Sequence, residues 1–260
     1  MNIRMVVLVA AATTIAACGS GSSRDGLQAH VSVVPQGSAS EAKAEHTIKS
    51  FRRGDGLRID LQLGLVNVAP IALEPCGADV ARWLDRLNPL GAAVAHGGDD
   101  ELPASLVDVM HEDGEAFELG SIGAEPGTYC GLVIALQPGD AEELKHGGEL
   151  DESMAGALVN VAPCYYPGTE GLSDEDAAAA HDHHCVQAKL LGEERTVTLP
   201  LPAPVTLDAD RRDVALTVVA RYEAWFEDLD MELLPTDAAQ QSKLGDNVAA
   251  AMEVIAAGTD

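Results

Sequence analysis

The feature that most constrains the fold of this chain is a recurring two-residue alternation of apolar and polar side chains. In residues 57–65 every odd position is leucine or isoleucine, and in residues 214–224 every even position is apolar. Successive side chains of a β-strand point to opposite faces, so this period is typical of strands with one buried face. Shorter stretches with strand character include residues 29–34, 128–136 and 157–162. The pattern predicts a mainly β protein.

Only two stretches have helical spacing. Apolar residues fall on one face of a helix near 78–88, and Leu244, Val248, Met252 and Ile255 form a stripe in a second helix near 236–257. Thr236 is the predicted N-cap of the second helix and Gly258 its C-terminal cap. Many short strands with few helices favour an antiparallel β-sandwich, immunoglobulin-like with Greek-key connections. An α+β arrangement with the last helix laid across a sheet is the alternative.

Proline restricts where one of these strands can lie. Pro200 lies within the alternating residues 197–201, and Pro202 follows them directly. Proline has no N–H group to donate to a neighbouring strand, so it is found mainly in edge strands. We therefore expect this strand at the edge of a sheet.

The N-terminus has the pattern of an export signal. Arg4 precedes an uncharged run over residues 5–17, which is too short to span a bilayer as a helix. The run ends in Ile15-Ala16-Ala17-Cys18, an aliphatic residue and two small ones before a cysteine. This resembles the signal of bacterial lipoproteins, which implies a diacylglycerol on the Cys18 thiol. Gly19 in place of aspartate after that cysteine implies the outer membrane.

These boundaries give three segments. Residues 1–17 are the predicted lipoprotein signal peptide, and the Gly- and Ser-rich residues 18–28 are a flexible tether that follows lipidated Cys18. Residues 29–260 are expected to form a single β-sandwich domain with acidic loop insertions. The lipid would hold this domain on the membrane of the cell envelope.

Four further cysteines occur at positions 76, 130, 164 and 185. An exported chain enters an oxidising compartment, and an even number of cysteines is consistent with two disulfides. Three pairings are possible. We expect the two sequential loops, Cys76–Cys130 and Cys164–Cys185.

The strongly negative net charge excludes some classes of binding partner. The formal net charge is −26, with acidic residues distributed along the whole chain. Such a surface repels nucleic acid and anionic lipid. The chain also lacks the G-x-S-x-G, H-E-x-x-H and C-x-x-C motifs and a phosphate-binding glycine loop. No residue pattern indicates a reaction, so we expect a protein that is not an enzyme.

The densest cluster of chemically active side chains is His181-Asp182-His183-His184-Cys185. Imidazole suits copper and zinc. On an extended segment His181 and His183 would share a side, whereas on a helical turn His181 and His184 would; Asp182 could assist either pair. If Cys185 is in a disulfide it cannot also be a thiolate ligand. The alternative is a solvated loop in which the histidines are incidental.

Two further stretches carry a resemblance to a known family. One is Pro126-Gly127-Thr128-Tyr129 before an apolar strand, and the other runs from Val205-Thr206-Leu207 through Trp225-Phe226 to Asn247. Together they are similar to the MbnP-like periplasmic copper-binding proteins, which are β-sandwiches associated with di-haem partner enzymes. The Gly-Trp-His-Gly motif of that family is absent. The resemblance therefore implies a sandwich fold and a preference for copper, and no functional residue.

Three functions remain, in order of preference. The first is a non-enzymatic membrane-anchored lipoprotein that binds copper or zinc, or a partner protein that handles the metal. The second is a structural or interaction lipoprotein of the envelope with incidental histidines. The third is an envelope hydrolase that uses loop carboxylates, which no motif supports.

Overall fold

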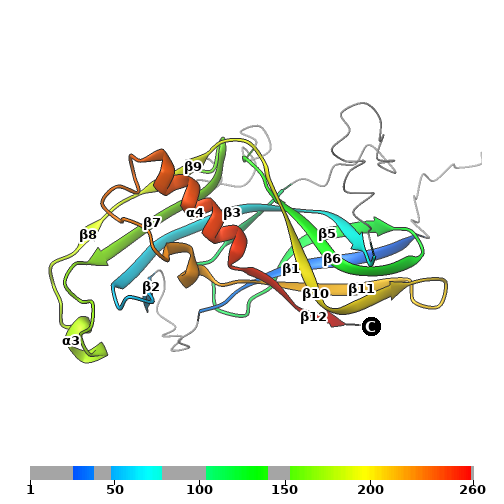
Figure 1. The fold of residues 1–260 in the computed structure, drawn as a ribbon, viewed down its shortest axis with the longest axis horizontal. Helices are drawn as coiled ribbons and strands as arrows, with labels where there is room; N and C mark the ends of the chain where they lie inside the picture. The colour runs from blue at the N-terminus through cyan, green and yellow to red at the C-terminus, as the bar shows by residue number, and fades with distance from the viewer. Residues whose placement is uncertain (1–25, 38–47, 78–103, 140–152, 259–260) are drawn as a thin grey trace, which may run out of the picture.

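The computed structural model of this chain describes residues 26–37, 48–77, 104–139 and 153–258 (Figure 1). The predicted signal peptide, Cys18, most of the tether and the predicted helix near 78–88 lie outside the described residues. No helix within the described ranges is long and apolar enough to cross a membrane.

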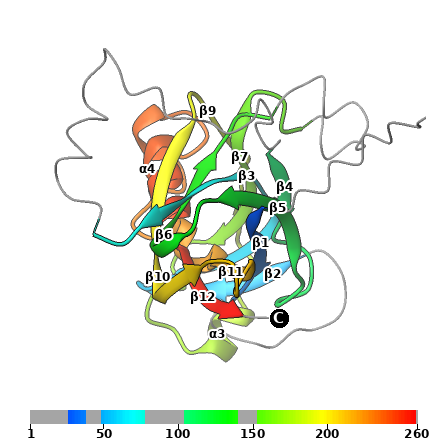
Figure 2. The same ribbon diagram turned by 90° about the vertical axis from the view of Figure 1, so that its right-hand side faces the viewer.

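Most described residues belong to two sheets (Figures 1 and 2). The first contains, in order, β12 (Met252–Gly258), β11 (Asp213–Ala220), β1 (Leu27–Pro35) and β5 (Phe117–Ala124). The second contains β10 (Arg195–Leu207), β6 (Gly127–Leu136), β3 (Arg58–Pro75), β7 (Ala157–Tyr166) and β8 (His184–Cys185). Outside this path, β2 (Lys49–Arg52) and β4 (Ser105–Asp108) pair with β3, and β9 (Ala188–Leu191) pairs with β7. The predicted mainly β, sandwich-like architecture is confirmed, and immunoglobulin-like Greek-key connections stay a prediction.

The sheets are largely, but not wholly, antiparallel. Strand β1 runs parallel to β11, with Gln28 opposite Asp213 and Pro35 opposite Ala220. Every other pair of named strands in the described residues is antiparallel, as expected for an antiparallel sandwich. Strands β1 and β11 are separated by most of the chain, so no short hairpin restricts their relative direction.

Strand β3 is the longest of the described strands. Its alternating apolar side chains point to one face of the sheet in the first part of the strand and to the other face further along. Its pairing with β7 shifts register between Leu61 and Gly64. Leu61 belongs to the main core, whereas Leu65 belongs to a second cluster with Met154. A bulge adds a residue on one strand and moves the following side chains to the other face. The sequence pattern predicts that the five alternating apolar residues at 57–65 share one face. In the structure they do not, because the bulge separates Leu61 from Leu65.

The edge position of β10 is confirmed. It is the terminal strand of the second sheet and pairs with β6 alone, with an irregularity in register between Pro200 and Val205. The prolines thus lie where the missing N–H groups interrupt few ladder hydrogen bonds.

The C-terminal helix is shorter than predicted. Helix α4 spans Ala238–Ala250, and its N-cap is Asp237, whose side chain accepts from the backbone N–H groups of Ala239 and Gln240. From Met252 the chain is the edge strand β12, paired with β11. Met252 is buried but Ile255 is half exposed, so the expected helical stripe ends at Val248. Pairing with β11 outweighs the helical spacing, since helix propensity is a weak preference.

The predicted strand at 214–224 also ends early. Strand β11 stops at Ala220, and residues Tyr222–Phe226 form the 3₁₀ helix η2. The side chain of Asn247 in α4 donates to the carbonyl oxygens of Trp225 and Glu227, at 3.1 and 2.8 Å. These bonds hold α4 against η2, where Trp225 is fully buried.

Both predicted disulfides are present. Cys76 is bonded to Cys130 and Cys164 to Cys185. The first links the residue after the end of β3 to the beginning of the neighbouring strand β6. The second joins β7 to β8.

Candidate functional site

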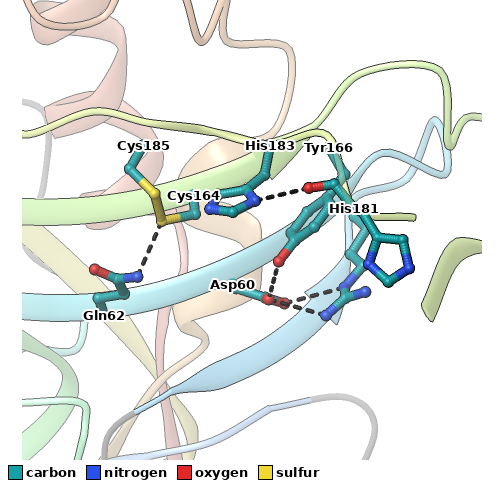
Figure 3. The surroundings of a disulfide bond; sticks show 8 residues. Asp60, Gln62, Cys164, Tyr166, His181, His183 and Cys185 are labelled. Atoms are coloured by element: carbon teal, nitrogen blue, oxygen red, sulfur yellow. Dashed lines mark hydrogen bonds and ion pairs between the residues drawn. A yellow bond between two sulfur atoms is a disulfide. The ribbon is translucent and has the colours of Figure 1, made fainter. Parts of the chain in front are cut away.

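The histidine cluster lies against one face of the second sheet. Ile59, Leu61 and Tyr165 point into the main core, so the residues between them point to the opposite face. We call this surface the β3–β7–β8 face; Figure 3 shows its residues, which are Asp60 and Gln62 of β3, Cys164 and Tyr166 of β7, and His183 and Cys185 at β8. It lies on the side of the sheet away from the core, although several of its side chains are buried.

A buried ion pair forms one end of this face. The Nε and Nη2 atoms of Arg58 donate to the Asp60 carboxylate at 3.1 and 2.9 Å, and the Tyr166 hydroxyl donates to it at 2.7 Å (Figure 3). Asp60 is 7% exposed, and a buried carboxylate requires such partners. Burial, reinforced by the hydrogen bond to Asp60, raises the pKa of Tyr166. The neutral phenol is therefore the stable donor at this position.

The loop that leads to the histidines is anchored by two arginines. Arg52 donates to the carbonyl oxygens of Thr169 and Leu172, and Arg58 donates to that of Ala177 at 3.1 Å. Ala177 belongs to the short helix α3 (Asp174–Ala178), which is capped by Ser173. The arginines of β2 and β3 thus position the loop beside the β3–β7–β8 face.

The far end of the loop is fixed by the disulfide. Cys164 and Cys185 occupy directly opposed positions of β7 and β8. The next residue, Val186, donates its N–H to the carbonyl oxygen of Pro163 at 3.0 Å. Gln62 donates its side-chain N–H to the sulfur of Cys164 at 3.0 Å (Figure 3). Cys164 is only 2% exposed, whereas Cys185 is exposed.

The three imidazoles do not converge. The His183 ring lies 5.3 Å from the Tyr166 ring on the β3–β7–β8 face, and the His184 ring stacks on Tyr165 on the other face, with a centroid separation of 5.5 Å. Figure 3 shows the His181 ring directed away from that of His183. All three histidines are exposed. Neither of the side-by-side pairs expected from the sequence is formed.

One imidazole nevertheless has a defined orientation. Nδ1 of His183 lies 3.1 Å from the carbonyl oxygen of His181. A carbonyl oxygen only accepts, so Nδ1 carries the hydrogen and Nε2 keeps its lone pair when the ring is neutral. Metal-bound histidines commonly have this arrangement, in which a backbone carbonyl orients the ring. His183 is therefore prepared to act as a ligand through Nε2.

No complete metal site exists in the part of the chain described. There, no group of three or more His, Cys, Asp and Glu side chains is arranged to hold an ion. Asp182 is exposed between His181 and His183. Two other histidines have partners of their own: His30 lies 2.6 Å from the Ser121 hydroxyl, and His111 lies 3.1 Å from Glu115. His46, His96 and His146 lie outside the described residues.

Sequence reasoning missed the Arg58–Asp60–Tyr166 cluster. A signal was present, because Arg58 and Asp60 occupy the polar positions of the alternating stretch 57–65. Those positions usually face solvent, and here the loop anchored by Arg58 covers them. Only the pairing of β3 with β7 brings Tyr166 beside Asp60.

Comparison with protein-family models, curated proteins and solved structures returned no match. The function of the β3–β7–β8 face is therefore inferred from the chemistry of its own residues.

Proposed function

We propose that this chain is a non-enzymatic lipoprotein of the bacterial envelope that binds a transition metal, copper or zinc, or a partner protein that handles it. The observation that carries the proposal is the orientation of His183, whose Nδ1–H is bonded to a carbonyl oxygen while Nε2 is left with a lone pair. Imidazole nitrogen suits both metals. The resemblance to the MbnP-like copper-binding proteins points the same way.

The proposed binding mode has few protein ligands. His183 supplies the first ligand, and rotation of the exposed His181 side chain, with Asp182 between them, can supply a second. His184 contributes only if it leaves Tyr165. An incomplete ligand set leaves coordination positions for a ligand from a partner protein. This property suits a protein that receives and passes on a metal, in contrast to closed structural sites that hold four protein ligands.

The N-terminal sequence and the disulfides support the proposed compartment. We propose that Cys18 carries the lipid and anchors the domain at the outer membrane. Two disulfides are the usual state of cysteines in an oxidising compartment. Replacement Cys18→Ala should release the protein from the membrane fraction, and a variant that stays membrane-bound would contradict the anchor.

Metal titration tests the proposed binding. Purified full-length protein is titrated with Cu(I), Cu(II) and Zn(II) against a competing chelator, beside the triple variant His181→Ala, His183→Ala, His184→Ala. The matched control replaces His30 and His111, two exposed histidines with other partners. One equivalent of metal, lost in the triple variant and kept in the control, supports the proposal. Several weak equivalents in all three proteins would mean that the acidic surface collects cations.

The interaction lipoprotein is the second candidate. The observation in its favour is that His183 and His184 are exposed, and each ring lies on a buried tyrosine, Tyr166 or Tyr165, which holds both imidazoles at the surface without any metal. Side chains that are already held in place lose little conformational entropy when a partner protein binds. This function predicts that the triple variant loses a partner in the envelope while the native protein binds no metal.

A further inference from the structure

We propose that the Cys164–Cys185 disulfide is a thiol–disulfide exchange site, at which an external thiolate forms a mixed disulfide with Cys185. The ligand class is a thiol, either a small molecule or the dithiol of a reductase protein. The exchange chemistry does not depend on metal binding. It rests on the unlike surroundings of the two sulfurs and on one hydrogen bond.

Access decides which sulfur is attacked. Exchange requires a thiolate to reach one sulfur of the bond, and its rate depends on which sulfur is accessible. Cys164 lies within the ten-residue strand β7 and is 2% exposed. Cys185 is exposed and lies on β8, which has two residues. Attack is therefore directed to the sulfur of Cys185.

The hydrogen bond from Gln62 supports the leaving group. When the external thiolate bonds to the sulfur of Cys185, the S–S bond breaks and Cys164 leaves with the electron pair as a thiolate. A buried thiolate is costly without a donor. The side-chain N–H of Gln62 already donates to this sulfur at 3.0 Å, so the donor is in place before the charge develops.

A second thiol completes the reaction. Its thiolate attacks the external sulfur of the mixed disulfide, which releases Cys185 as a thiolate and forms the external disulfide. Two electrons pass from the two thiols to the protein, and both cysteines end as thiols after protonation. If the second thiol is absent, the Cys164 thiolate can attack the sulfur of Cys185, which re-forms the protein disulfide and releases the first external thiolate.

Opening the bond would remove the covalent restraint on the histidine segment. Strand β8 is paired only at Cys164 with Cys185 and at Tyr165 with His184. The arginine contacts hold the loop at Thr169, Leu172 and Ala177, upstream of the histidines. Reduction therefore removes the covalent link at Cys185, where the two strand pairs and the Val186 N–H bond to Pro163 remain, and leaves the α3 end anchored.

The other disulfide provides an internal comparison. Both Cys76 and Cys130 are half-buried, so neither is as accessible as Cys185. The N–H of Cys76 is bonded to the carbonyl oxygen of Thr128 at 2.9 Å, which holds the chain at that disulfide. We expect Cys76–Cys130 to resist thiols under conditions that open Cys164–Cys185.

The experiment treats the native full-length protein with glutathione in the absence of denaturant. The reaction is quenched with acid, free thiols are alkylated, and peptides are analysed by mass spectrometry. The expected result is a glutathione adduct on Cys185, an alkylated Cys164, and opening at least about tenfold faster than that of Cys76–Cys130. An adduct on Cys164, equal rates for the two disulfides, or reaction only after unfolding would overturn the proposal.

The role of Gln62 is tested separately. Gln62→Met keeps the side-chain length and removes the donor, so it should slow opening about 2- to 13-fold, the range that one hydrogen bond supplies. The matched control is Gln137→Met, because the side-chain N–H of native Gln137 donates to Glu194 and not to a cysteine sulfur. Equal opening rates in the Gln62 variant, the control and the native protein would exclude the leaving-group role.

Discussion

Raising the pH above about 10 should lower the stability of this protein, because its tyrosines are held in their neutral form by burial. The chain contains four tyrosines, and all are buried, with exposed fractions of 4–9%. Burial is the largest cause that raises the pKa of each one, and the nearby Asp113 carboxylate raises that of Tyr222 further. The members of this set are Tyr129, Tyr165, Tyr166 and Tyr222.

The sign of the effect follows from proton linkage. Below the ordinary tyrosine pKa, both the folded and unfolded states keep the phenolic proton, so the contribution to stability is full. Above it, the unfolded chain loses the proton while the folded chain retains it, so the free energy of unfolding falls as pH rises. Each tyrosine contributes at most about 1.36 kcal/mol per pH unit, and the four together at most about 5.4 kcal/mol per pH unit.

Two measurements examine this prediction. Urea unfolding followed by tryptophan fluorescence should show stability that is constant between about pH 8 and 9.5 and falls steeply above about pH 10. Phenolate absorbance should appear together with unfolding, and Tyr222→Phe should lessen the slope. Four phenols that titrate near their ordinary pKa in a protein that is still folded would refute the reasoning.

Three substitutions test separate parts of the structure by urea unfolding. Gly64→Ala places a Cβ 2.4 Å from Cγ2 of the buried Val109, so it should destabilise the protein by about 1–3 kcal/mol; an unchanged midpoint would contradict the close approach at the β3 bulge. Asp237→Ala removes the N-cap of α4 and should cost about 1 kcal/mol, whereas Asp237→Asn, which can still cap, should cost less. Tyr166→Phe removes the hydroxyl donor to Asp60 and should cost about 1.5–3 kcal/mol; a neutral result would mean that solvent replaces this bond.

The alternation of side chains was sufficient to predict the fold class, because period-two patterns arise from strand geometry itself. The same alternation could not reveal the bulge at Gly64, which depends on where β7 pairs with β3. It could not give the parallel pairing of β1 with β11 either. Both depend on contacts between segments far apart in the chain, and no local pattern contains them.

The C-terminal segment shows a different limit. The apolar spacing at Leu244 and Val248 is helical and correctly predicts α4. The next two members of the stripe, Met252 and Ile255, belong instead to the edge strand β12. Strand β11 has β1 on one side and pairs with β12 on the other, so this segment gains ladder hydrogen bonds that a longer helix would forgo. That pairing overrides local spacing and is visible only once the sheet is assembled.

The candidate site was predicted in part. Cysteine count and order were enough to favour the Cys164–Cys185 pairing, which is present. The histidines were found by their density in the sequence, but their directions were not. His183 and His184 lie on opposite faces because their neighbours in β7, Tyr166 and Tyr165, do. Side-chain direction at an exposed segment is set by the strand against which it lies.

The most direct test of the account follows individual imidazole groups by NMR while copper(I) or zinc is added below one equivalent. Metal binding at the β3–β7–β8 face predicts that the ring resonances of His183 shift or broaden first, with those of His181 next, and that Nε2 of His183 is the nitrogen affected. His30 and His111 should stay unchanged at this metal level. Equal shifts in all histidines, or shifts confined to His30 and His111, would contradict metal binding at the β3–β7–β8 face.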